Sequence, residues 1–163
     1  MTWVHLHLAL NHIPVLGTLF VGILFVIAFA KRSPELTRLS LIAFVTLTVI
    51  SIPIKFTGDF AYESMAEADW MPADIAQAHE QAADQATSAI FLLGLASMLG
   101  LYLGRGSRRL PVWSLVVTSV LTVITFVLMA RAANLGGQLR HEEIRPVTIR
   151  EKRLGLDWQP FVS

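Results

Sequence analysis

The chain has 163 residues, of which 54% are hydrophobic, and its mean hydropathy is +0.58. A soluble domain of this size carries more polar surface, so the composition indicates a membrane protein. The formal net charge of +1 excludes a strongly basic nucleic-acid-binding protein, and no nucleic acid is expected as a partner. The absence of cysteine excludes disulfides, thiolate catalysis, iron–sulfur clusters and c-type haem attachment, so any metal must have nitrogen or oxygen ligands.

The first apolar stretch, residues 8–30, is long enough to cross a bilayer core of about 30 Å, which takes about 20 helical residues. Three of the five histidines in the chain, His5, His7 and His12, lie at its beginning. In a regular helix His5 and His12 share one face, because seven residues make nearly two turns. We expect each of them to meet a partner from another helix. His7, close to Trp3, fits a hydrogen-bonded side chain at the membrane interface.

Three further apolar spans are predicted at residues 39–56, 76–103 and 111–133. Pro14 and Pro53 each remove one donor from a helical hydrogen-bond ladder. The last helix should end at Gly136-Gly137, since each glycine costs about 1 kcal/mol relative to alanine. We therefore predict an all-α fold, a four-helix transmembrane bundle that runs up-down-up-down over residues 1–145. An extended C-terminal tail, residues 146–163, follows it.

The segment between the second and third spans is acidic. Asp59, Glu63 and Glu67 repeat every four residues, while Tyr62 and Met65 fall on the opposite side of a helix. This spacing predicts a short amphipathic helix on the outer face of the membrane. An acidic stripe of this kind is typical of a solvated face, with a cation site as the alternative.

Basic residues gather in the other two turns, around residues 31–38 and 105–109. The positive-inside rule places these turns in the cytoplasm. We therefore expect a multi-pass protein of the bacterial inner (cytoplasmic) membrane, with both termini outside, in the periplasm. All five histidines then lie at the outer face.

Four stretches resemble a family of small bacterial four-span membrane proteins of unknown function. They are residues 10–15 (Leu-Asn-His-Ile-Pro-Val), Thr57-Gly58, His79-Glu80 and residues 134–144 (Asn-Leu-Gly-Gly-Gln-Leu-Arg-His-Glu-Glu-Ile). The resemblance covers residues 1 to about 145. It implies the four-helix fold and draws attention to His12, His79 and His141, but it implies no activity.

A b-type haem is the most concrete ligand for histidines from two helices of a membrane bundle. The first and third spans of such a bundle are diagonal, so His12 and His79 could bind opposite faces of one porphyrin. His5 and His141 are further candidates. Cations near the same face could pair with the haem propionates, or they could snorkel to the interface or pair with Asp59. These cations are Lys55, Arg131 and Arg140.

On this interpretation the protein is an electron-transfer subunit of an oxidoreductase complex, not an enzyme by itself, and it takes electrons from membrane quinol or a neighbouring chain. One alternative is a cofactor-free accessory subunit of a larger complex. Another is a Zn or Cu site, or a small-ligand site, built from His12, His79 and His141 with Glu80 or Glu142. His79-Glu80 lacks the second histidine of the H-E-x-x-H helix, which excludes a zinc protease of that type.

Besides the lipid bilayer, we expect a protein partner. The tail, residues 146–163, has too few apolar residues to fold by itself. We expect it to dock on another membrane or periplasmic protein or on a second copy of this chain. Trp158 and Phe161 are the predicted anchors, because aromatic residues are enriched at the centres of interfaces.

Overall fold

The computed structural model describes residues 2–65, 68, 71–106 and 110–145. The elements in this part of the chain are all helices, which confirms the predicted all-α class. They are α1 (Trp3–Leu10), α2 (His12–Ala30), α3 (Pro34–Met65), α4 (Ala73–Leu103), α5 (Val112–Arg140) and a 3-10 turn, η1 (Glu142–Ile144). The tail and its predicted anchors, Trp158 and Phe161, lie outside the described residues.

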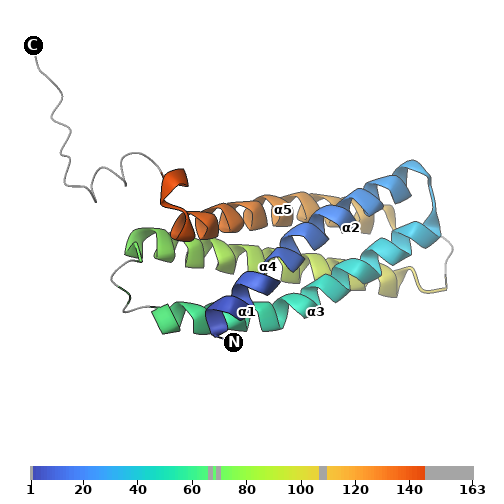
Figure 1. The fold of residues 1–163 in the computed structure, drawn as a ribbon. Coiled ribbons are helices and arrows are strands. Elements are labelled where there is room, and N and C mark those ends of the chain that lie inside the picture. The colour runs from blue at the N-terminus through green and yellow to red at the C-terminus, as the bar shows by residue number, and fades with distance from the viewer. Residues whose placement is uncertain (1, 66–67, 69–70, 107–109, 146–163) are drawn as a thin grey trace, which may run out of the picture.

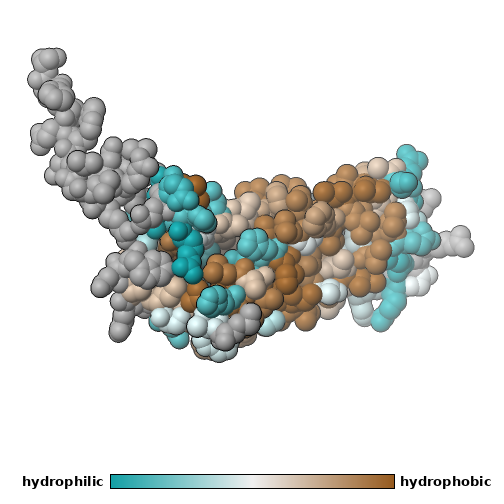
Figure 2. All heavy atoms as spheres, viewed as in Figure 1, coloured by the Kyte–Doolittle hydropathy of each residue, from teal (hydrophilic) through white to brown (hydrophobic). Residues whose placement is uncertain are grey.

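Within the described residues, four helices are long and apolar enough to cross a bilayer. They are Trp3–Ala30, which combines α1 and α2, then Pro34–Met65, Ala73–Leu103 and Val112–Arg140. A helix of about 30 residues is about 45 Å long, so each of them exceeds a hydrocarbon core of about 30 Å. Apolar side chains cover the middle of the molecule and hydrophilic residues gather toward its two ends (Figure 2). The chain is a multi-pass membrane protein, as its composition predicts.

The four long helices form a closed ring. In it, α2 packs on α3, α3 on α4, α4 on α5 and α5 on α2, while α1 packs mainly on α3. The helices α2 and α4 are therefore diagonal, as predicted for the first and third spans. In Figure 1 the ends of α2 and α4 and the starts of α3 and α5 lie together, at what we call the basic end. The end of α3, the start of α4 and the end of α5 lie at the other end, the histidine end.

The core changes in character along the bundle. One cluster of buried residues consists of Phe25, Leu41, Phe44, Leu93 and Leu110, and a second consists of Leu47, Ala86, Ile90 and Met129. Toward the histidine end, several buried positions are alanines: Ala61, Ala76, Ala82 and Ala132. Most other large apolar side chains face outward, as expected where the solvent is lipid.

The first span is not one regular helix. The helix is interrupted at Asn11, but the backbone of this residue stays in the right-handed helical region (φ −61°, ψ −22°) and its N–H bonds to the carbonyl of His7. Helices α1 and α2 therefore follow one another within one span, and the shared face of His5 and His12 stays a prediction. The cause of the interruption is Pro14, which has no N–H to donate to the carbonyl of Leu10 and whose ring crowds that carbonyl. Pro53, in contrast, lies inside α3 without ending it.

The predicted amphipathic surface helix does not exist as a separate element. Helix α3 continues to Met65, so Asp59 and Glu63 belong to its last turns. Glu67 lies outside the described residues. Hydropathy falls where the chain leaves the hydrocarbon, but the hydrogen-bond ladder of α3 continues beyond that point.

Candidate functional site

His79 lies on α4 at the histidine end and faces α5. Its Nδ1 is 2.9 Å from the carbonyl oxygen of Ala132. A carbonyl can only accept, so Nδ1 carries the proton and donates it. In the neutral ring this tautomer leaves Nε2 as a bare acceptor, and in the described part of the chain no hydrogen bond involves Nε2.

Gly136 makes room for this ring. A Cβ at Gly136 would lie 3.0 Å from Cε1 of His79, closer than ordinary contact. The predicted end of the helix at Gly136-Gly137 is wrong, because α5 continues to Arg140. The close approach of His79 and its hydrogen bond to α5 outweigh the low helix propensity of glycine.

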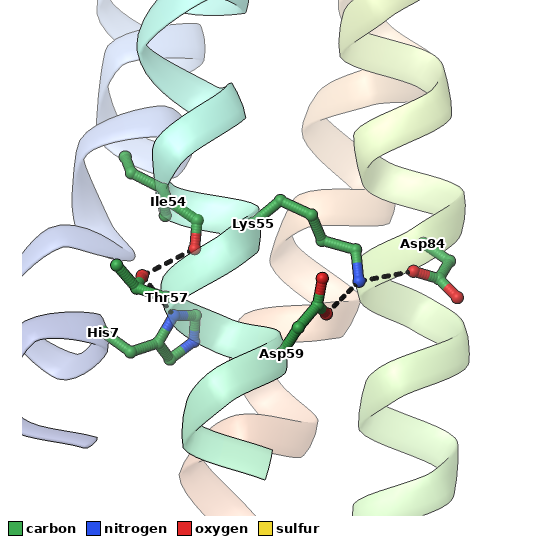
Figure 3. A network of polar contacts seen from close by, with 6 residues as sticks. All are labelled: His7, Ile54, Lys55, Thr57, Asp59 and Asp84. Carbon is green, nitrogen blue, oxygen red and sulfur yellow. Dashed lines mark hydrogen bonds and ion pairs between the residues drawn. The ribbon is translucent and has the colours of Figure 1, made fainter. Parts of the chain in front are cut away.

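The ring of His7 is held against a neighbouring helix in a similar way, between α1 and α3 (Figure 3). Its Nδ1 is 3.3 Å from the hydroxyl oxygen of Thr57, and that hydroxyl donates to the carbonyl of Ile54 at 2.7 Å. The hydroxyl proton is therefore used, so Thr57 accepts from Nδ1 and Nε2 of His7 is bare. A Cβ at Gly58 would lie 2.9 Å from Cε1 of His7, so a glycine again admits the ring.

The two imidazoles belong to one electrostatic cluster. His79, Asp59 and Lys55 are all near enough for their charges to interact with His7. The side chain of Lys55 is 27% exposed, and its Nζ bridges Asp59, one turn further along α3, and Asp84 of α4 at 2.9 Å. Figure 3 shows Lys55 reaching from α3 to Asp84. Of the roles considered for Lys55, pairing with Asp59 is therefore observed, and the ion pairs link the helices that carry Thr57 and His79.

The remaining candidates lie on the outside. The ring of His5 is exposed and Nδ1 is 2.7 Å from the hydroxyl of Thr2, which caps α1. His12 is exposed at the first position of α2 and has no hydrogen bond within the described residues. Arg131 is exposed and donates to Gln85 of α4 at 3.1 Å. Arg140 is exposed in the last turn of α5.

His141 follows α5 and is also exposed. Its Nδ1 lies 2.9 Å from the carboxylate of Glu143. A hydrogen bond from the amide of Glu143 itself, and then the His141 ring, lower the pKa of this carboxyl. This pair is a surface contact and involves neither the His7 ring nor the His79 ring.

The structure thus brings together His79, Lys55 and a histidine that the sequence analysis treated as interfacial, His7. Among the described residues no group of three His, Cys, Asp or Glu side chains could hold a metal ion, so the three-ligand Zn or Cu site is not assembled there. The sequence does carry a signal for His7, because Thr57-Gly58 supplies a small residue and a hydroxyl side by side on the facing span.

We predict opposite effects for alanine at the two adjacent glycines. Gly137→Ala adds a Cβ 3.4 Å from Ile144 Cδ1, an ordinary contact, and should stabilise α5 by up to about 1 kcal/mol. Gly136→Ala should leave the protein about 2 kcal/mol less stable than Gly137→Ala, since it pushes His79 off the Ala132 carbonyl. Thermal unfolding in detergent measures the difference. Equal melting temperatures would contradict the close packing of the His79 ring against Gly136.

No family model, curated protein or solved structure matches the chain. The resemblance to four-span proteins of unknown function therefore stays a prediction.

Proposed function

We propose that the protein is a membrane electron-transfer subunit that binds a b-type haem at the histidine end, with His7 and His79 as the iron ligands. One observation carries this proposal: both rings donate through Nδ1 to a protein acceptor and keep Nε2 bare. Histidines that bind metal ions have this arrangement, because the second hydrogen bond fixes the tautomer and the orientation of the ring. The donor set fits a haem iron, which takes two neutral imidazoles.

The position of the two rings supports the same proposal. They come from α1 and α4, two helices that both pack on α3, and cofactor sites in helix bundles are built from side chains of separate helices. Bound haem would supply one-electron transfer. The chain's own residues would hold the imidazoles neutral, orient them through Ala132 and Thr57, and offer cations such as Arg131 to the propionates.

An optical spectrum of the purified protein, oxidised and reduced, tests the proposal. We expect the sharp α-band of a low-spin b-type cytochrome in the reduced state and one haem per chain by extraction. A preparation without haem after expression in haem-supplemented cells would favour the cofactor-free accessory subunit. Stoichiometric zinc or copper without haem would favour the other metal site.

We further propose that the basic end lies in the cytoplasm and the histidine end in the periplasm of a bacterial inner membrane. The support is the charge at the basic end, where Lys31, Arg32, Arg38 and Arg105 lie. Electrons would then come from quinol or a neighbouring chain. The protein partner, whether a membrane or periplasmic protein or a second copy, would dock through residues 146–163.

Single cysteines can test the orientation, since the chain has none. Lys31→Cys and Glu63→Cys replace exposed residues at opposite ends. An impermeant thiol reagent should label Glu63→Cys in intact spheroplasts and Lys31→Cys only after lysis. The reverse pattern would invert the proposed orientation.

A further inference from the structure

Three hydroxyl groups in the middle of the bundle have no hydrogen-bond partner among the described residues. They belong to Ser97 of α4 and to Thr118 and Thr125 of α5, and these residues are at most 1% exposed. Hydroxyls elsewhere in the same bundle donate to the carbonyl one turn earlier in their own helix, as is usual in membrane helices. These are Ser40, Thr46, Thr48, Ser51, Ser88, Ser119 and Thr122.

The three unpartnered hydroxyls follow the seam between α4 and α5. A Cβ at Gly100 would lie 3.4 Å from the hydroxyl oxygen of Ser114, which fixes the antiparallel register of the two helices. One turn further on, this register sets Ser97 opposite Thr118. Thr125 lies two turns along α5 on the same face as Thr118.

A fourth hydroxyl from α2 extends this row. Thr18 is fully buried, and its hydroxyl reaches only the thioether sulfur of Met129 at 3.5 Å. The hydroxyl proton points to sulfur, which is a weak acceptor. The oxygen lone pairs of Thr18 can still accept from a donor. The row thus reaches from the middle of the bundle to within about one turn of Ala132, which binds His79.

A buried hydroxyl without a partner is unfavourable, because it has lost its hydrogen bonds to water and gained none. Several such groups on one seam, without the bond to their own helix that the other hydroxyls make, indicate polar ligands between the helices. Buried water is the smallest ligand that both donates and accepts, and it makes about three hydrogen bonds in such sites. We propose that Ser97, Thr118 and Thr125 bind internal water molecules that bridge α4 and α5.

The bound water has two consequences for the bundle. It links α4 to α5 by hydrogen bonds across a seam that otherwise depends on packing of small side chains. It also brings exchangeable protons onto the seam that holds His79. Neither consequence depends on whether haem is bound.

The test compares two triple variants of the full chain. Ser97→Ala/Thr118→Val/Thr125→Val removes the three unpartnered hydroxyls while nearly preserving volume. Ser119→Ala/Thr46→Val/Thr122→Val removes three hydroxyls that bond to their own helix. Infrared spectra in H2-16O and H2-18O identify bands of bound water, and thermal unfolding follows stability.

We expect the wild type and the control to share isotope-sensitive bands of weakly hydrogen-bonded water, and the first variant to lose them. Its melting temperature should fall at or below that of the control, by up to about 5 °C. Retention of the bands would overturn the proposal. A higher melting temperature than the control would overturn it too, because it would show that the hydroxyls had no ligand to lose. Thr118→Val alone, judged against Thr122→Val by the same criteria, decides the matter if the triple variant does not fold.

Discussion

His79→Ala and His7→Ala should each abolish the low-spin spectrum of the reduced protein. The physical reason is that low-spin haem iron requires two strong axial ligands, which we propose are these two imidazoles, and no other histidine in the described residues is held against a neighbouring helix in this way. The spectrum of each variant, recorded with the haem content per chain, measures the effect. We expect high-spin haem or none.

His12→Ala is the matched control for this experiment. His12 lies on the same span and belongs to the pair that the sequence favours, but it is exposed and has no hydrogen bond within the described residues. It should keep the wild-type spectrum. If His12→Ala loses the spectrum while His7→Ala retains it, the pair of His12 and His79 is correct and His7 has only a structural role.

Gly94→Ala should be the most damaging single-methyl change in the bundle. A Cβ at this buried position would lie 2.3 Å from Oγ1 of Thr48 and 2.7 Å from its Cβ, so α3 and α4 would have to move apart. Overpacking of this kind costs about 3 kcal/mol, of which the better helix propensity of alanine returns about 1. The net loss of about 2 kcal/mol should lower the melting temperature by about 4–8 °C.

A second substitution identifies the cause of that loss. Thr48→Ala in the Gly94→Ala background removes Oγ1 and Cγ2 of Thr48, which would lie 2.3 and 2.8 Å from the added Cβ, along with the hydrogen bond to the Ile90 carbonyl, and leaves the Thr48 Cβ in place. The double variant should be more stable than Gly94→Ala, which is a strongly non-additive outcome for a pair in contact. Additive effects would show that Oγ1 and Cγ2 of Thr48 are not the atoms for which Gly94 leaves room.

The number of spans could be predicted from the sequence because the bilayer imposes it. Lipid cannot hydrogen-bond to the backbone, so each crossing requires about 20 apolar residues in a helix, and such stretches are visible in the sequence. Helix ends are set differently. Met65 and Arg140 end α3 and α5 well past the apolar stretch, where local hydrogen bonds and packing decide, and Gly136 lies inside α5, where its lack of a side chain leaves room for His79.

Of the two histidines of the candidate site, one could be predicted from the sequence. His79 follows from its place at the start of the third span. The sequence favours His12 as its partner because His7, close to Trp3, fits an interfacial side chain, whereas the structure sets the His7 ring against Thr57 and leaves His12 exposed. The register of α1 against α3, which sets His7 beside Thr57, is a long-range packing choice, and Thr57-Gly58 on the facing span is its trace in the sequence.

The two helices of the N-terminal span, α1 and α2, pack against different parts of the bundle. Helices α2 to α5 close the ring by themselves, whereas α1 contacts α3 and meets α2 only at its joint. His7 therefore lies on a two-turn segment outside the ring, and the packing of α1 on α3 sets the position of its imidazole. A load on the N-terminus, such as a fused domain or a bound neighbour, would act first on the contact between α1 and α3 that positions His7.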